Sequence, residues 1–129
     1  MLLAMGQGGK MSKVKEVLVN TIKGTGDTGE AAVEASKDLI KTGATSVGDL
    51  VKTAFEVVKD TSEDTIDFVK FVVVGAVEAT KEAGGHTAEG VGKVITEAEN
   101  AAGDIVVEGG EQARKGVAKA KEIVMQPFK

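Results

Sequence analysis

Few residues in this chain could take part in catalysis or metal binding, and their spacing does not match a known site. His86 is the single histidine and there is no cysteine, so a His-rich or thiolate metal site is excluded. Asp60, Glu63, Asp64 and Asp67 stand at helical spacings, where carboxylates either collect a divalent cation or form a solvated face. No calcium loop with a central glycine surrounds them, so we interpret them as a solvated acidic face.

The segment GQGGKMS, residues 6–12, contains the residue types of a phosphate-binding loop. That loop requires a glycine six residues ahead of its Lys–Ser/Thr pair and a strand before it, and the segment has neither. The chain also lacks a Ser/His/Asp arrangement and a paired-carboxylate setting. We therefore predict no enzyme activity, no catalytic residue, no cofactor and no metal.

Composition narrows the classes of partner. The 16 basic and 20 acidic residues give a net charge of −4, which argues against non-specific nucleic-acid binding. Aromatic residues are only 3% of the chain, so base-stacking platforms are not expected either. A length of 129 residues suggests one domain. Its apolar residues are mainly Val and Ala, which bury little area each, so we expect stabilisation by a partner or a surface.

An 11-residue repeat organises nearly the whole chain. Steps of eleven from Val47 land on apolar or small residues in both directions, from Val14 to Val124. Eleven residues make three turns at about 3.67 residues per turn, close to the period of a straight α-helix. We predict an all-α protein of long amphipathic helices built on this repeat. They would form a right-handed or near-straight coiled coil, or a helical bundle with glycine turns.

The repeat places apolar residues on one arc of the helix, at its first, fourth, fifth and eighth positions. The fourth and fifth positions extend this stripe as far as Ile105–Val106, and the eighth is always small, which lets another backbone approach closely. We predict that a lipid or a partner covers Val47, Leu50, Val51, Ala54, Val58, Val69, Val72, Val73, Ala76, Val91, Val94 and Ile95. The second position is often basic, and we predict headgroup-facing lysines at Lys15, Lys37, Lys59, Lys70 and Lys81.

Breaks in the repeat suggest the domain organisation. Residues 1–11 are expected to be a flexible leader, 12–126 the helical domain and 127–129 a tail. Met11–Ser12 resembles a second start, and the apolar stretch of residues 2–5 is too short for a signal peptide. Ser12 is a candidate cap for the first helix, and Pro127 is expected to end the last one near Met125.

Within the helical domain, the strongest helix is predicted from Val47 to Ala83, after a capping pattern that begins at Ser46. Breaks are expected at Gly24–Gly29, Gly84–Gly85 and Gly109–Gly110, with a further one near Gly43. The phase of the repeat survives all of these glycines, whereas loops of arbitrary length would scramble it. Long helices with soft points are therefore favoured over a bundle, which remains the alternative.

The most hydrophobic run, Phe68–Val77, is about half a membrane span and contains Lys70, so no transmembrane helix is expected. Two interpretations remain for this run. It is either the buried centre of an assembly or the deepest-inserting part of a helix bound to a surface.

Two families share these features. Ser36-Lys37-Asp38, Val58-Lys59-Asp60 and Thr80-Lys81-Glu82 resemble the 11-residue repeats of group 3 late-embryogenesis-abundant proteins, and residues 87–94 resemble the repeats of synucleins. The resemblance implies an amphipathic helix that forms on a membrane or on drying. This chain has fewer lysines, many valines and a net negative charge, which favour protein–protein packing more than in those families.

We therefore expect a non-enzymatic amphipathic-helix protein that is lipid-surface-associated or stress-protective. Its location would be cytoplasmic, and possible attachment to a membrane would be peripheral. The alternative is a structural homo-oligomer, a coiled-coil or helical-bundle assembly in which the stripe packs against copies of itself. The expected partner is thus the chain itself or a lipid surface.

Overall fold

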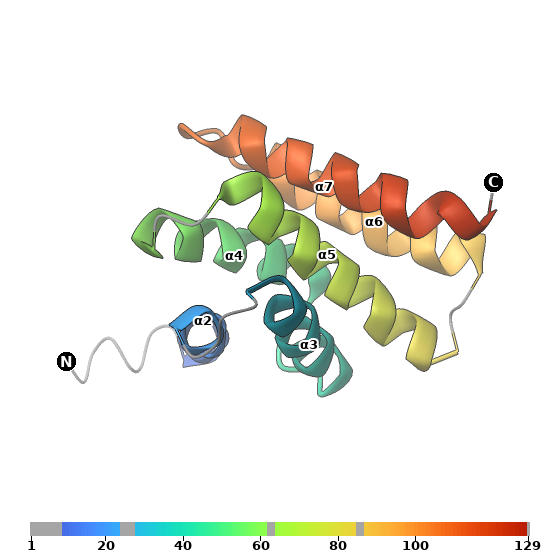
Figure 1. Ribbon diagram of the computed structural model, residues 1–129, viewed down its shortest axis with the longest axis horizontal. Helices are drawn as coiled ribbons and strands as arrows, with labels where there is room; N and C mark the ends of the chain where they lie inside the picture. The colour runs from blue at the N-terminus through green and yellow to red at the C-terminus, as the bar shows by residue number, and fades with distance from the viewer. Residues whose placement is uncertain (1–8, 24–27, 62–63, 85–86, 129) are drawn as a thin grey trace.

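The described residues of the computed structural model, 9–23, 28–61, 64–84 and 87–128, contain helices and no strand, so the all-α prediction is confirmed there. Figure 1 shows the helices coloured in chain order from blue in α2 to red in α7. The helices are α2 (Gly9–Lys23), α3 (Thr28–Lys41), α4 (Val47–Thr61), α5 (Thr65–Glu82), α6 (Ala88–Gly103) and α7 (Gly110–Met125), followed by a 3₁₀ turn, η1 (Gln126–Phe128).

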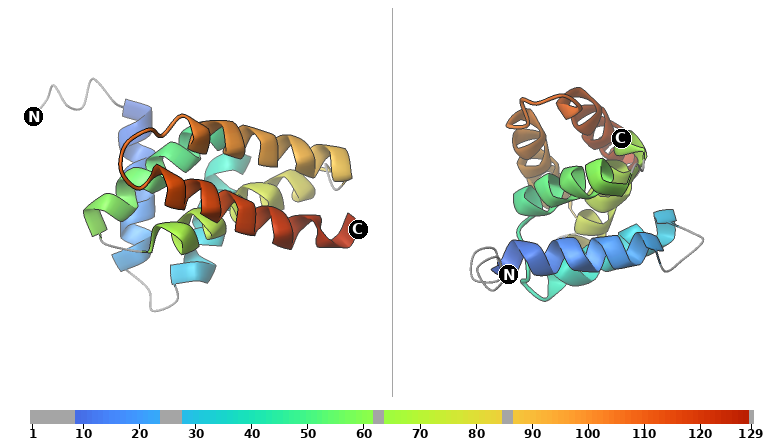
Figure 2. Two further views of the ribbon diagram at one scale, coloured as in Figure 1. Left: turned by 90° about the horizontal axis from the view of Figure 1, so that it is seen from above. Right: turned by 90° about the vertical axis from the view of Figure 1, so that its left-hand side faces the viewer.

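Helix α5 is the centre of the molecule and packs against α3, α4, α6 and α7. Helices α6 and α7 lie side by side along one side of it (Figure 1). Helices α2 and α3 lie on the opposite side, where α2 contacts both α3 and α4. Helix α2 is seen end-on in Figure 1 and lengthwise in Figure 2, so it crosses the α5–α7 direction steeply. The run Phe68–Val77 therefore lies in the middle of a packed bundle.

Polar side chains begin three of the helices by accepting hydrogen bonds from the first-turn backbone. The Asp49 N–H donates to Ser46 Oγ at 3.2 Å before α4, as the capping pattern predicted. The Asp67 N–H donates to Asp64 Oδ1 at 3.0 Å before α5, and the Gly90 N–H donates to Thr87 Oγ1 at 3.0 Å before α6. These caps define where the chain re-enters a helix after each turn.

Glycines with positive φ form three of the turns. Gly43 has φ of 76°, Gly84 of 98° and Gly109 of 99°, a region that other residues rarely adopt. The breaks predicted near Gly43 and at Gly109–Gly110 are thus confirmed. Gly84 follows the end of α5, whereas Gly85 lies outside the described residues. Helix α7 ends at Met125, as predicted from Pro127.

The 11-residue repeat falls alternately in helix interiors and at helix ends or turns. Its small eighth position is fully buried at every second occurrence, in the middle of a helix, at Ala32, Ala54, Ala76, Ala98 and Ala120. The intervening occurrences lie at helix ends and turns, at Thr21, Gly43, Thr65, Thr87 and Gly109. The helices begin 19, 19, 18, 23 and 22 residues apart, so their spacing matches two repeats only from α5 onward, whereas the buried alanines recur every 22 residues throughout.

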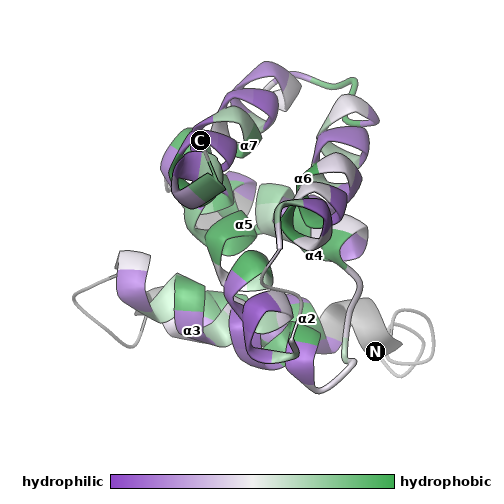
Figure 3. Cartoon of the chain, turned by 90° about the vertical axis from the view of Figure 1, so that its right-hand side faces the viewer, coloured by the Kyte–Doolittle hydropathy of each residue, from purple (hydrophilic) through white to green (hydrophobic). Residues whose placement is uncertain are grey.

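Two glycines bring helix backbones into close contact. A Cβ at Gly75 of α5 would lie 2.5 Å from the Val33 carbonyl oxygen and 2.8 Å from Ser36 Cβ, both on α3. A Cβ at Gly116 of α7 would lie 2.7 Å from the Ile66 carbonyl oxygen on α5. Helix α5 is thus approached closely from two directions, and Figure 3 shows it between α7 and α3. Eight of its residues are buried: Phe68, Val69, Val72, Val73, Gly75, Ala76, Val77 and Ala79.

Four sequence-based expectations need correction. The expected long helices are not found. The described helices span only 14 to 18 residues and pack against one another. The predicted helix Val47–Ala83 is two helices, and Asp64 caps the second. Helix α2 begins at Gly9, so it includes residues assigned to the leader, while residues 1–8 lie outside the described part. Gly29, placed in a break, lies in α3.

Candidate functional site

The predicted stripe is the core of the bundle. All twelve of its residues are buried, including Leu50, Val73 and Val91, which have no exposed surface. In the folded chain they belong to one core cluster that the chain's own helices form. For these residues to contact a lipid or a partner, the helices would have to separate. Their predicted role in such a contact stays a prediction.

The five predicted headgroup-facing lysines come from four helices, with Lys15 on α2 and Lys59 on α4. Lys37, Lys70 and Lys81 are partly buried and each lies near a carboxylate three residues before it, at 3.3, 3.7 and 3.8 Å. The ammonium of Lys70 lies 4.5 Å from the centre of the Phe71 ring. Lys59 lies over Phe55, at 5.5 Å from its ring centre. These stems cover apolar surface while the charges stay near water.

An ion-pair cluster joins α3 to α5, and the sequence pattern did not indicate it. Glu82 accepts a hydrogen bond from Lys41 Nζ at 2.7 Å, and Lys37 Nζ lies 3.1 Å from its other oxygen. Hydrogen bonds from Lys41 and then Lys37 hold the pKa of Glu82 below its ordinary value of 4.5. The hydrogen bonds to Glu82 and then to Glu34 raise the pKa of Lys37. The cluster is open to solvent, so it orients α3 more than it stabilises the fold.

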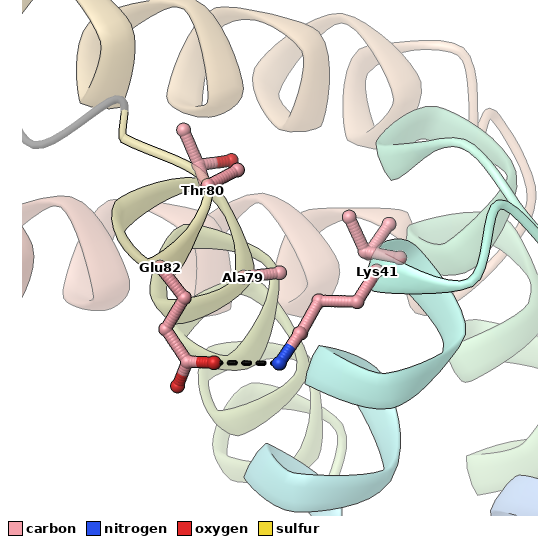
Figure 4. A pocket seen from close by; sticks show the side chains of 6 residues that line it. Lys41, Ala79, Thr80 and Glu82 are labelled. Atoms are coloured by element: carbon pink, nitrogen blue, oxygen red, sulfur yellow. Dashed lines mark hydrogen bonds and ion pairs between the residues drawn. The ribbon is translucent and has the colours of Figure 1, made fainter.

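A shallow cleft of about 440 Å³ lies beside this cluster, lined by Ile40, Lys41, Ala79, Thr80, Glu82 and Ala83. Figure 4 shows Lys41 reaching across it to Glu82. Glu82 pairs with both Lys37 and Lys41, and Glu34 pairs with Lys37, so two carboxylates balance two lysines beside an apolar floor. This arrangement is a helix–helix contact with no group poised as a nucleophile or general base.

The loop between α6 and α7 departs from the repeat. Val106 was expected on the buried stripe beside Ile105, yet it is 89% exposed and its neighbour Val107 is 55% exposed. Ile105 is buried, so the chain turns between the two residues. Helix α6 ends at Gly103, before Val106. A glycine at this place is the sequence signal that the helical pattern stops ahead of Val106.

Of the acidic residues expected on a solvated face, the structure describes the side chains of Asp64 and Asp67, and both are exposed. Asp64 caps α5, and Asp67 lies near Lys70. Glu63, His86 and the side chain of Asp60 lie outside the described part of the chain. Within the part that is described, no three His, Cys, Asp or Glu side chains are grouped so that they could hold a metal ion.

Among the described helices, none combines the length and apolar character needed to cross a membrane. Comparisons with family models, curated proteins and solved structures found no match to this chain. The resemblance to late-embryogenesis-abundant and synuclein repeats therefore stays a prediction, and the function has to be argued from the geometry.

Proposed function

We propose that this protein is a non-enzymatic amphipathic-helix protein, lipid-surface-associated or stress-protective. It folds as a closed bundle when free and opens on a lipid surface. One observation carries the proposal: the apolar stripe keeps the same phase of the 11-residue repeat in the helices on either side of each turn. In this proposal the protein is cytoplasmic and becomes peripheral to a membrane when it opens.

The constant phase of the repeat is informative because a helical bundle can form without it. Helices joined by turns can each place an apolar face on the core whatever the number of residues in the turn. Twenty-two residues are six turns at about 3.67 residues per turn, so a turn that became helical would join its neighbours with their stripes aligned. The buried alanines at residues 32, 54, 76, 98 and 120 would then lie on one face of a continuous helix.

The bundle is held closed mainly by apolar burial, which a lipid surface can also provide. The core residues of the stripe are mostly Val and Ala, and burial of this apolar face is the main force that favours the closed state. A lipid interface buries the same face, so it offsets the loss of helix–helix packing. The ion pairs between helices, such as Lys52–Asp104 and Lys121–Glu99, are exposed and contribute little.

The test is a distance measurement on the opening of α3 from α5. The chain has no cysteine, so Lys41→Cys with Glu82→Cys introduces two unique sites for spin labels. The two side chains touch in the bundle, whereas 41 residues of continuous helix would separate them by roughly 60 Å. We expect a short distance in buffer and a long one after addition of phosphatidylcholine vesicles.

The matched control is a pair of spin labels within one helix. Glu89→Cys with Glu97→Cys lies on the exposed side of α6, and its distance of about 12 Å should be the same in both states. An unchanged short distance between positions 41 and 82 on protein that co-sediments with vesicles would refute the opening. Helix content alone does not decide the matter, because both states are helical.

The structural homo-oligomer remains the alternative. It predicts that light scattering in buffer gives a multiple of the monomer mass and that vesicles leave the distance between positions 41 and 82 unchanged. The proposal predicts a monomer mass in buffer, because the stripe is already covered by the chain's own helices.

A further inference from the structure

Two adjacent valines protrude from the loop between α6 and α7, residues 104–109. Val106 is 89% exposed and Val107 is 55% exposed. In the part of the chain that the structure describes, Ile123 on α7 is the one other large apolar side chain so exposed. Solvent exposure of neighbouring apolar side chains is unfavourable, and such a patch typically marks an interaction surface.

The loop is held in place by several contacts. Arg114 Nη1 donates to the carbonyl oxygens of Ala102, at 3.3 Å, and Ile105, at 3.2 Å. The Gly110 N–H donates to the Val107 carbonyl at 3.1 Å, and Ile105, in the same loop, has its side chain buried in the core. The valines are therefore displayed on a braced turn, and their exposure does not come from a frayed chain end.

Helix α4 supplies the surroundings of the loop. Phe55 packs beneath Gly109, where an added Cβ would lie 3.0 Å from its ring, and a recess of about 410 Å³ separates the loop from α4. Lys52 and Lys59 provide positive charge at this recess, and Glu56 and Asp104 provide negative charge. Lys52 Nζ and Asp104 Oδ2 lie 3.5 Å apart, so the two signs are interspersed.

We propose that the Val106–Val107 loop is the element that first inserts into a lipid surface, and that this surface is zwitterionic. The inference rests on the proposed function, which supplies the lipid. A protruding loop inserts readily into a soft interface, whereas a folded partner would need a matching cavity. The mixed charges around the loop suit headgroups that carry both signs, while the net charge of −4 disfavours an anionic surface.

A fluorescent reporter tests which element enters the lipid first. The chain has no Trp and no Tyr, so Val106→Trp introduces the sole strong emitter. Stopped-flow mixing with phosphatidylcholine vesicles is expected to shift its emission to the blue before the spin labels at positions 41 and 82 separate. Ile123→Trp is the control, because it is also exposed but lies on α7, and its emission should not shift ahead of the opening.

A second pair of variants measures the contribution of the valines. Val106→Ser with Val107→Ser should weaken partitioning into phosphatidylcholine vesicles by about tenfold or more, the effect of losing at least one buried valine side chain. Both residues are exposed, so circular dichroism and the urea midpoint should be unchanged. Ile123→Ser should change partitioning by less than about twofold.

The outcomes separate this inference from the proposed function. Label separation on vesicles while the indole at position 106 stays in water would overturn the loop inference and leave the opening intact. A blue shift without label separation would support insertion of the loop and refute the opening. A dimer in buffer that the double serine variant dissociates would show that a second copy of this chain covers the loop, and would overturn the inference.

Discussion

Replacement of Gly75 by alanine probes the contact on which the bundle most depends. The added Cβ would lie 2.5 Å from the Val33 carbonyl oxygen and 2.8 Å from Ser36 Cβ, whereas unstrained heavy atoms stay about 3.5 Å apart. One of the two obstacles is backbone, so α3 has to move away from α5 by roughly 1 Å. Such overpacking costs about 1–3 kcal/mol.

The helix propensity of alanine offsets a part of this cost. Exchange of glycine for alanine inside a helix stabilises it by roughly 0.5–1 kcal/mol. We therefore expect Gly75→Ala to lower the free energy of unfolding by between about zero and about 2.5 kcal/mol, in contrast to the gain that alanine alone would bring. Urea unfolding followed by circular dichroism measures it, and the expected fall in the midpoint is up to about 1 M.

Gly92→Ala is the matched control. Gly92 lies inside α6 with ordinary helical φ, and nothing is within 4 Å of its added Cβ. The same chemical change should therefore raise the free energy of unfolding by roughly 0.5–1 kcal/mol. If Gly75→Ala stabilised the protein as much as Gly92→Ala does, α3 and α5 would not cross at Gly75, and the reasoning from the bundle would be refuted.

Three further predictions concern the core and the surface. Val73→Asp should lower the free energy of unfolding by at least about 3 kcal/mol in urea titrations, because it buries an unpaired carboxylate, whereas Glu56→Gln on the exposed side of α4 should change it by less than about 0.5 kcal/mol. A large effect of Glu56→Gln would contradict the burial pattern. Ser36→Ala should raise the urea midpoint, because the Ser36 hydroxyl is buried and has no hydrogen-bond partner; a lower midpoint would show that the hydroxyl is bonded. Because the pKa of Glu82 is lowered, its stabilising effect is present above pH 4.5 and is lost as the pH falls through the folded-state value. Below pH 4.5 the gap between the urea midpoints of the wild type and Glu82→Gln should therefore close, and a gap that stays constant with pH would contradict the ion pairs to Lys37 and Lys41.

Much of the local structure could be predicted because it depends on neighbours in sequence. The helical period, the turns at Gly43 and Gly109 and the end of α7 at Met125 follow from residues within a turn of each feature. The break between α4 and α5 could not be predicted, because no Gly or Pro occurs between Thr61 and Thr65. Asp64 caps α5, yet aspartates also occur on solvated helix faces, so the residue type alone does not mark the start of a helix.

Less of the candidate site than of the local structure could be predicted from the sequence. Periodicity identifies one apolar face, so it located the core stripe but not the further buried faces of α5 at Phe68, Gly75 and Ala79. The partners of Glu82 lie on another helix, and their spacing in sequence carries no signal. The exposed Val106 has the same residue type as its buried counterparts, and only its place after the end of α6 distinguishes it.

By itself, the sequence determines that the chain is helical and which side of each helix is apolar, because both depend on intervals of three and four residues within one segment. Only the tertiary structure decides what covers that side. The same stripe can be buried by sister helices, by a second chain or by lipid, since apolar burial has no direction. In the folded chain it is buried by sister helices, and the close approaches at Gly75 and Gly116 bring α3 and α7 onto α5.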